Sequence, residues 1–263
     1  MSEFTLRGAI FDLDGVITAT ARSHFRAWKA TFEGFLKETG REENPTFTYE
    51  DDYIPYVDGK PRYNGVQSFL ESRGVSLPWG DPSEEPGNKT ICAVGNKKND
   101  AFRETVATDG VDLYETTLRL VKELKAKGVK VGVASSSKNT GYVLETVGLS
   151  DLFEAVVDGV VSAELGLNGK PAPDIFVVAA ERMGLEPKEC MMVEDAYAGV
   201  EAGLNGNFAL VLGVNREGGA QGLYARGADI VVPDLGDITV ADIEEWFEKG
   251  IEESSWRLQY HGF

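Results

Sequence analysis

Asp12-Leu13-Asp14-Gly15-Val16 follows directly after the apolar run Leu6–Phe11, and this stretch decides the fold. The run has the length and composition of a buried strand. Residues two positions apart on an extended backbone project to the same side, so Asp12 and Asp14 present two carboxylates together. Gly15 then allows a sharp turn. Such a pair can divide the labour of phosphoryl chemistry: one carboxylate attacks phosphorus and the other exchanges a proton with the incoming or leaving oxygen.

The composition of the 263-residue chain narrows the classes of partner. Its 43 acidic side chains outnumber the 26 Lys and Arg, which gives a net charge of −17. This sign disfavours nucleic acid and anionic membrane surfaces, because both attract cations. The two cysteines are too few for a disulfide framework, and no apolar stretch is long enough to span a membrane. Since the first strand leaves no room for a signal peptide, we expect a cytoplasmic protein.

The chain beyond residue 110 alternates short apolar runs with amphipathic segments, which predicts an α/β fold with a doubly wound parallel sheet. We expect this core to comprise residues 1–18 and 111–245, with an α-helical cap domain inserted at 19–110 and a C-terminal tail at 246–263. The predicted strands are Leu6–Phe11, Val129–Ala134, Ala155–Val157, Cys190–Val193, Phe208–Leu212 and Ile230–Val232. The predicted helices are Thr20–Glu38, Pro61–Ser72, Lys97–Ala107, Leu113–Lys127, Asn139–Val147, Ala172–Met183 and Ala198–Leu204.

The predicted cap contains one segment without a regular pattern. Residues 74–95 are rich in Pro and Gly, and a loop of this length is typical of a functional lid or a disordered insert. The aromatic stripe of the first cap helix is expected to face the cap core: Phe25, Trp28, Phe32 and Phe35. Nearby acidic residues are expected to form solvated surface: Glu43, Glu50, Asp51 and Asp52.

Polar side chains stand at each strand end that should border the ligand crevice of such a sheet. They are Asp12 and Asp14 after the first strand, Ser135, Ser136, Ser137 and Asn139 after the second, Glu194 and Asp195 after the fourth, and Lys170 in a loop before a helix. Each has an ordinary interpretation when taken alone, since Ser and Asp commonly cap helices and a Lys before Pro is commonly an exposed turn. Their coincidence at consecutive crevice positions favours a site.

The residue types match the needs of Mg²⁺-dependent phosphoryl transfer, which requires hard oxygen ligands for the metal and donors for the phosphoryl oxygens. The candidate metal ligands are Asp12, Asp195, the backbone carbonyl of Asp14, and Glu194 as a direct or outer ligand. Ser135 and Lys170 can donate to the phosphoryl oxygens, together with the N–H groups of the following helix N-terminus.

The sequence resembles the haloacid dehalogenase superfamily of aspartate-nucleophile phosphotransferases. Its four motifs are matched by Asp12-Leu13-Asp14-Gly15, Ser135, Lys170 and Glu194-Asp195. The insertion after the first motif resembles the helical cap type of this superfamily. The resemblance implies that Asp12 is the nucleophile and that Mg²⁺ is the cofactor.

A narrower resemblance points to the β-phosphoglucomutases, carried by the stretches 11–28, 134–139 and 169–176. It implies that Arg62 grips the non-reacting phosphate of the substrate and that Lys98 reaches the sugar and the nucleophile. It also implies distal-phosphate contacts for residues of the serine loop: Ser137 and Asn139, beside Ser135 and Ser136. An arginine suits the phosphate role because its planar fork donates two hydrogen bonds at once.

Thr20 and His24 are four residues apart on the first cap helix, and are therefore expected on one face beside Asp14. His24 could relay protons or tie cap closure to the position of Asp14. The alternative is a histidine that only packs in the cap.

Three functions remain open from the sequence. The first is a mutase that interconverts β-D-glucose 1-phosphate and glucose 6-phosphate through an aspartyl-phosphate on Asp12 and a bisphosphate intermediate. The second is a sugar-phosphate phosphatase with the same nucleophile, and the third is a non-catalytic accessory module. The cap segment 56–62 resembles versions found beside or fused to glycoside phosphorylases, and the tail 255–263 looks like the beginning of another domain. These resemblances imply a functional pairing or fusion with such an enzyme.

Overall fold

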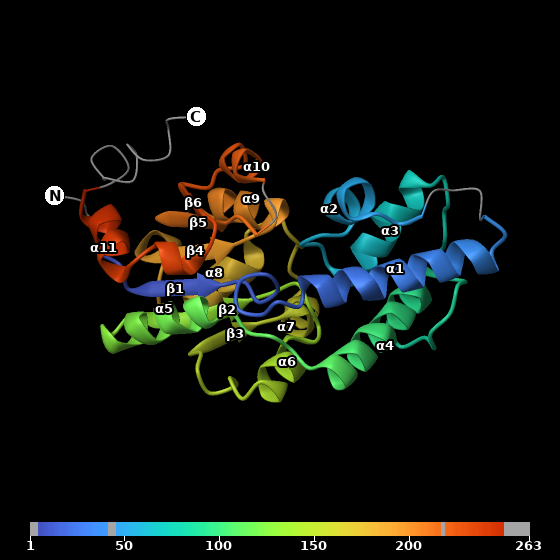
Figure 1. The fold of residues 1–263 in the computed structure, drawn as a ribbon, viewed down its shortest axis with the longest axis horizontal. Helices are drawn as coiled ribbons and strands as arrows, with labels where there is room; N and C mark the ends of the chain where they lie inside the picture. Colours follow the sequence, from blue (N-terminus) through green and yellow to red (C-terminus); the bar gives the residue numbers. More distant parts are fainter. Residues whose placement is uncertain (1–4, 42–45, 217–218, 250–263) are drawn as a thin grey trace. The chain divides into compact units, whose positions relative to one another are not determined.

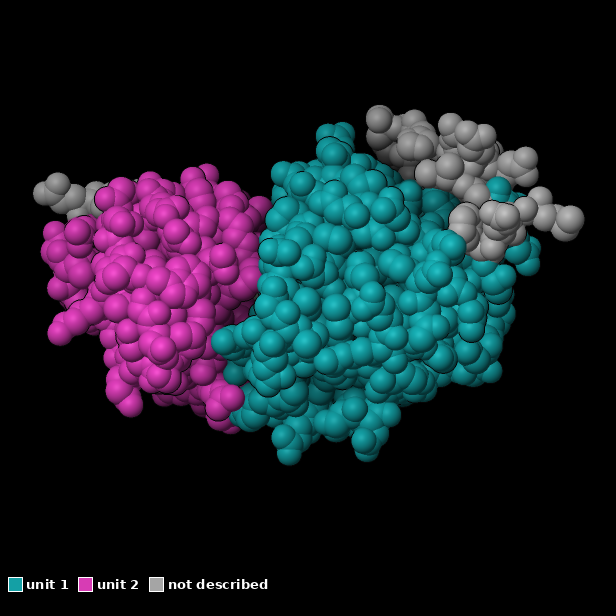
Figure 2. All heavy atoms as spheres, turned by 180° about the vertical axis from the view of Figure 1, so that it is seen from behind, with its two compact units in different colours: residues 1–18, 113–263 teal, residues 19–112 magenta. Residues whose placement is uncertain are grey.

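The computed structural model describes residues 5–41, 46–216 and 219–249. The chain separates into two compact units, coloured differently in Figure 2. Unit 1 consists of Met1–Thr18 and Leu113–Phe263, and unit 2 of Ala19–Asp112. The sequence analysis placed the return of the chain from the cap to the core between residues 110 and 111, which is two residues before the observed boundary. Each unit has a hydrophobic core of its own.

Unit 1 is built on a six-stranded parallel sheet with the order β3-β2-β1-β4-β5-β6 (Figure 1). The strands are β1 (Gly8–Phe11), β2 (Lys130–Ala134), β3 (Ala155–Val157), β4 (Cys190–Glu194), β5 (Leu210–Val214) and β6 (Ile230–Val232). This order confirms the predicted doubly wound α/β fold. Strand order reverses direction between β1 and β4, so the ligand crevice of this sheet type lies at the carboxyl ends of these two strands.

The helices of unit 1 pack on both faces of the sheet. They are α5 (Glu115–Ala126), α6 (Thr140–Thr146), α7 (Gly159–Leu165), α8 (Asp174–Arg182), α9 (Tyr197–Asn205), α10 (Ala220–Tyr224) and α11 (Val240–Lys249), with short 3₁₀ turns η2 (Pro187–Glu189) and η3 (Leu235–Asp237). Buried Ile10, Met192 and Val211 of the sheet share one core with Phe176 of α8 and Val200 of α9. Helix α5 contacts β2 and α11.

Unit 2 is helical and has an aromatic core. Its elements are α1 (Ala21–Glu38), the π-helical turn η1 (Tyr49–Tyr53), α2 (Ile54–Tyr56), α3 (Arg62–Ser72) and α4 (Ile91–Asp109). The ring of Phe32 lies 5.0 Å from Trp28 and 4.1 Å from Phe69, and Phe35 is buried beside them. Phe25 packs against this cluster, so the predicted stripe is confirmed. No helix in the described ranges of either unit has the length and apolarity needed to cross a membrane.

The predicted loop at 74–95 is shorter than expected and is not a disordered insert. Helix α4 begins at Ile91, because the Thr90 hydroxyl accepts a hydrogen bond from the N–H of Ala93 at 3.0 Å and so caps the helix. The preceding loop is tied to this cap, since the N–H of Ile91 donates to the carbonyl of Pro78 at 3.0 Å. The sequence interpretation overlooked this N-cap threonine.

The expectation of solvated acidic surface is wrong for Asp52. Its side chain is buried and pairs with Arg73, with 2.5 Å between Oδ1 and Nη2. A partner 21 residues away carries no local sequence signal, which is why Asp52 looked like surface. Glu50 and Asp51 are exposed as expected, whereas Glu43 lies outside the described residues.

The predicted boundary between core and tail at residues 245–246 is also wrong. Helix α11 continues through Lys249, and its Trp246 and Phe247 are buried. The indole N–H of Trp246 donates to the carbonyl of Ala209 at 3.0 Å, which fixes the helix against the start of β5. The remainder of the predicted tail, 250–263, lies outside the described residues.

Candidate active site

An acidic cluster lies where the sheet order reverses. The register pairs Phe11 of β1 with Val193 of β4, so Asp12 and Glu194 leave their strands side by side. Asp195 follows, and one carboxylate oxygen from each of the three acids lies within 4.8 Å of the other two. Asp12 and Glu194 are buried, at 5% and 1% exposure. Three hard oxygen donors at this spacing suit a divalent metal ion.

The ammonium group of Lys170 lies between two of these acids. It comes from the loop before α8, and its Nζ is 2.6 Å from Oδ1 of Asp12 and also bonded to Oε1 of Glu194. All three side chains are buried. A buried charge is tolerated when it is paired and hydrogen-bonded, and here one cation serves two anions. The surplus negative charge leaves the site complementary to a cation.

Burial and the neighbouring charges both shift the pKa values of Lys170 and Asp12. Burial would lower the pKa of the Lys170 ammonium, but the carboxylates of Asp12 and Glu194 outweigh it and raise that pKa above its ordinary value. Burial raises the pKa of Asp12, with Lys170 acting against the shift and Glu194 and Asp14 adding to it. Lys170 is therefore held charged, and it is the group that favours the ionised form of Asp12.

Two glycines make room for the acids. Gly15 has φ +87°, and a Cβ there would overlap the carboxylate of Asp195. Gly199 lies in the first turn of α9, and a Cβ there would overlap the carboxylate of Glu194. The second oxygen of Glu194, Oε2, accepts from the N–H of Ala196 at 2.7 Å. Both oxygens of Glu194 are thus engaged within the protein.

The serine loop after β2 folds on itself. The N–H of Ser135 donates to Val157 of β3 at 3.0 Å, and the Ser135 hydroxyl accepts from the N–H of Ser137 at 3.1 Å. The Ser137 hydroxyl in turn accepts from the N–H of Asn139 at 3.2 Å. Ser135 and Asn139 are buried, while Ser136 and Ser137 are partly exposed. The hydroxyls hold the loop before α6, which places its residues at the carboxyl end of the strand beside β1.

Unit 2 brings together His24 and Lys98. Nδ1 of His24 lies 2.6 Å from Nζ of Lys98, and the imidazole stacks on Phe102 with 4.0 Å between ring centroids. Lys98 is 3% exposed and its Nζ lies 4.8 Å from the ring of Trp28. Thr20 is buried directly before α1, and its carbonyl accepts from the N–H of His24. His24 therefore packs on an aromatic ring and contacts a polar partner at once.

Arg62 begins α3 and is tied to α4. Its Nη2 donates to Oδ1 of Asn99 at 2.7 Å, and Asn99 is the residue that follows Lys98. The guanidinium lies 5.8 Å from the ring of Tyr63, and burial lowers its pKa from the ordinary value. Unit 2 thus presents the two predicted cationic groups from neighbouring helices.

Sequence reasoning missed several residues that support these groups. In unit 2 they are Asn99 and Phe102. In unit 1 they are Gly199 and Arg216, whose Nε donates to the carbonyl of Gly15 at 2.9 Å. Phe102 lies four residues after Lys98 and therefore on the same face of α4, a signal that was available. Gly199 and Arg216 follow no local pattern and are recognised only by their contacts.

Comparison with known proteins agrees with this geometry. The family described as haloacid dehalogenase-like hydrolase matches residues 6–207. A protein of Mycobacterium bovis named "Beta-phosphoglucomutase" is 44% identical over 239 residues, covering 89% of this chain and 91% of that protein. A Mycobacterium tuberculosis protein named "Uncharacterized glycosyl hydrolase" is 35% identical over 235 residues, 88% of this chain but 17% of its own length.

A solved structure shares the architecture. The crystal structure of β-phosphoglucomutase from Clostridium difficile superimposes with a TM-score of 0.74 at 26% identity, covering 92% of this chain and 97% of that one. The chain therefore belongs to the haloacid dehalogenase-like hydrolase family and, within that family, to the β-phosphoglucomutase group.

Proposed function

We propose that this phosphotransferase interconverts β-D-glucose 1-phosphate and glucose 6-phosphate through an aspartyl-phosphate on Asp12 and a bisphosphate intermediate. The observation that carries the proposal is the buried carboxylate of Asp12, held by Lys170 where the sheet order reverses, in a chain 44% identical to a protein named for this activity. A carboxylate positioned by a fixed cation in a dry site is a suitable nucleophile towards phosphorus.

Two acids share the chemistry in this proposal. Oδ of Asp12 attacks phosphorus while Asp14 gives a proton to the leaving oxygen, and Asp14 later removes a proton from the attacking hydroxyl of the sugar. Asp14 is partly exposed, whereas Asp12 is buried, which suits one acid to proton exchange and the other to covalent attack. The partial exposure of Asp14 leaves it accessible to the reacting oxygen.

Mg²⁺ is the divalent ion we assign to the acidic cluster. Its ligands would be Asp12, Asp195 and the carbonyl of Asp14. Glu194 fits better as an outer residue, because its two oxygens are engaged by Lys170 and by the N–H of Ala196. When bound, the ion neutralises charge between the nucleophile and the phosphoryl group.

The remaining predicted residues are assigned to substrate binding. In unit 1 they are Ser135, Ser136, Ser137, Asn139 and Lys170, and in unit 2 they are Arg62 and Lys98. Thr20 and His24 keep the catalytic role predicted for them, with His24 as the candidate proton relay. The contact of Arg62 with Asn99 supports a distal-phosphate role, since it fixes the plane of a guanidinium that can still donate from its other nitrogens. The sugar-phosphate phosphatase could use the same core, but it is the weaker alternative, because relatives named for the mutase are more similar to this chain than one named for a sugar-phosphate phosphatase.

The deciding experiment is a product assay. Purified protein receives β-glucose 1-phosphate, Mg²⁺ and a trace of glucose 1,6-bisphosphate, and glucose 6-phosphate and free phosphate are followed together. We expect glucose 6-phosphate without matching phosphate release. Arg62→Ala should reduce isomerisation far more than the hydrolysis of a simple phosphate ester, because only isomerisation needs a second phosphate to be held. Free phosphate as the main product would establish the phosphatase instead.

Two further expectations belong to this proposal. A cytoplasmic location is consistent with the absence of a membrane-crossing helix among the described residues. A functional pairing with a glycoside phosphorylase stays a prediction that no comparison supports, since the long relative is named a glycosyl hydrolase.

A further inference from the structure

A half-buried arginine outside the predicted motifs joins three segments of unit 1. Arg216 lies two residues after β5, and 14% of its side chain is exposed. Its Nε donates to the carbonyl oxygen of Gly15 at 2.9 Å, and its Nη1 pairs with Oδ2 of Asp234 at 2.6 Å. The guanidinium carbon lies 3.6 Å from the ring centroid of Tyr114. We propose that Arg216 is a positioning residue that orients Asp14 through the Gly15 peptide.

The contact with Gly15 reaches the proposed acid–base residue by one peptide. Gly15 has φ +87° and no side chain, so its carbonyl could rotate readily without an external bond. Arg216 holds this carbonyl, while the N–H of the same residue donates to Thr18 at 2.7 Å. Both peptide groups of Gly15 are therefore anchored, and the direction in which Asp14 leaves the backbone is set by them.

The arginine is itself held rigidly. Asp234 accepts from the N–H of Gly236 at 2.7 Å through its other oxygen, which leaves Oδ2 aimed at Arg216. Burial opposes ionisation of Asp234, but the hydrogen bonds from Arg216, Gly236 and Thr116, together with the charge of Arg216, outweigh it and lower the pKa of that carboxyl. Tyr114 adds a flat surface under the guanidinium, and its N–H donates to Ile17 at 3.0 Å. A planar fork with these partners keeps one orientation.

If Arg216 positions Asp14, removing it should slow phosphoryl transfer to Asp12 by an amount that depends on the leaving group. As Oδ of Asp12 bonds to phosphorus, the bond from phosphorus to the leaving oxygen breaks, and that oxygen takes the proton of Asp14. A sugar oxygen needs this proton, whereas acetate leaves acetyl phosphate without one. A misdirected Asp14 should therefore slow transfer from a sugar phosphate and spare transfer from acetyl phosphate. This reasoning rests on the proposed function.

The test compares two phosphoryl donors in Arg216→Met. Single-turnover phosphorylation of Asp12 is measured with glucose 1,6-bisphosphate and with acetyl phosphate, both with Mg²⁺. We expect a loss of about 100-fold with the bisphosphate, the size typical of a displaced catalytic group, and little change with acetyl phosphate. Arg216→Lys should recover only part of the loss, because an ammonium cannot reproduce the fork and the stacking together.

Arg226 provides a matched control. Its guanidinium carbon lies 4.0 Å from the ring centroid of Tyr197, and its Nη1 donates to the carbonyl of Gly222 at 3.2 Å. The local contacts are of the same kind, but they do not involve the loop after β1. Arg226→Met should leave the ratio of the two phosphorylation rates unchanged.

The outcomes separate the two proposals. An equal loss with both donors, or no loss, in a folded Arg216→Met would overturn the positioning role. If that variant does not fold, Asp234→Asn is used, because it weakens the contact that holds Arg216. We expect a smaller loss that is again confined to the bisphosphate, and an equal loss with both donors would overturn the role. If the wild-type aspartyl-phosphate passes its phosphoryl group to water and not to a sugar, the mutase proposal fails. The ratio of the two Asp12 phosphorylation rates can still be measured in that case, so the positioning role is tested separately. No phosphorylation from either donor would overturn both.

Discussion

Lys170 shows how one residue can control both the chemistry and the stability of the site. Its ammonium is bonded to the buried carboxylates of Asp12 and Glu194. Lys170→Met leaves two like charges facing each other without a cation. We expect a loss of about 100- to 1000-fold in phosphoryl transfer and of about 3–5 kcal/mol in the free energy of unfolding. Single-turnover rates and chemical denaturation measure the two effects.

The pH dependence of that variant follows from the direction of the Asp12 shift. Burial already raises the pKa of Asp12, and Lys170 opposes the shift, so removing the lysine raises the pKa further. A carboxyl group whose folded pKa is raised stabilises the fold at low pH and loses that contribution as pH rises through the folded value. The deficit of Lys170→Met against wild type should therefore grow as the pH rises above the ordinary range of an aspartate pKa. Lys188→Met, at an exposed ion pair, is the control and should show neither effect. A pH-independent deficit would contradict the argument.

Some residues of the site could be grouped from the sequence, and others could not. Asp12 and Glu194 were predicted because parallel strands bring their carboxyl ends to one edge, so a strand assignment is enough to group them. Lys170, in a loop before a helix, joins them through the combination of motifs and the family resemblance. The pairing of His24 with Lys98 joins residues 74 positions apart, and the sequence analysis, which singled out each residue separately, did not predict it. Such contacts depend on helix packing, which local periodicity does not encode.

At the scale of elements, Asn96 on α4 holds the long loop of unit 2. Its Nδ2 donates to the carbonyls of Glu84 at 2.7 Å and Pro82 at 3.1 Å, and its Oδ1 accepts from the Tyr63 hydroxyl at 2.9 Å. Asn96→Ala removes these three hydrogen bonds, and such a bond contributes about 0.5–1.5 kcal/mol. We expect faster amide exchange at 79–92, measured by hydrogen exchange with mass spectrometry.

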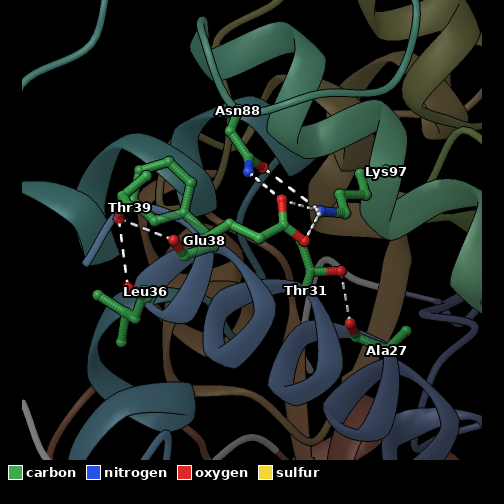
Figure 3. A network of polar contacts seen from close by, with 8 residues as sticks. Ala27, Thr31, Leu36, Glu38, Thr39, Asn88 and Lys97 are labelled. Atoms are coloured by element: carbon green, nitrogen blue, oxygen red, sulfur yellow. Dashed lines mark hydrogen bonds and ion pairs between the residues drawn. The ribbon is translucent and has the colours of Figure 1, made fainter. Parts of the chain in front are cut away.

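The neighbouring Lys97 is the control for this loop. Figure 3 shows Glu38 between Lys97 and Asn88, with 3.0 Å from Lys97 Nζ to Glu38 Oε1. This network is solvent-exposed, and such ion pairs contribute about 0–1 kcal/mol. Lys97→Ala also leaves the bond from Asn88 to Glu38 in place. Its loop should exchange like wild type; if both variants exchange equally fast, Asn96 is not the anchor.

The sequence predicted the bounds of some elements, displaced others and missed one short helix between β3 and α8. The predicted strand at 155–157 has the observed bounds, since buried runs of β-branched residues are distinctive. The strand predicted at 208–212 lies at Leu210–Val214, because buried Phe208 extends the apolar run without joining the sheet. Helix α7 was missed although Asp158 caps it and Gly166 ends it, since seven residues show too little periodicity.

At the scale of the whole molecule, the two units have different kinds of core. Unit 1 is held by aliphatic strands under helices, whereas unit 2 relies on stacked rings around Phe32. The sequence predicted this division because strand-like runs are lacking between residues 40 and 110. It did not predict how the rings pair, since that depends on the packing of α1 against α3. Cores made of separate residue sets predict separate responses to mutation.

Paired substitutions test that independence. Phe69 is fully buried in unit 2, 4.1 Å from the ring of Phe32, and Phe176 is fully buried in unit 1 beside Phe208. Each change to Ala removes a large ring from a closed core and should cost about 3–5 kcal/mol. We expect Phe69→Ala to speed amide exchange in α1, α3 and α4 and to leave β1, β4 and β5 protected, with Phe176→Ala giving the reverse. Loss of protection in both units from either change would mean that they unfold as one cooperative body, because local cores alone cannot transmit the effect.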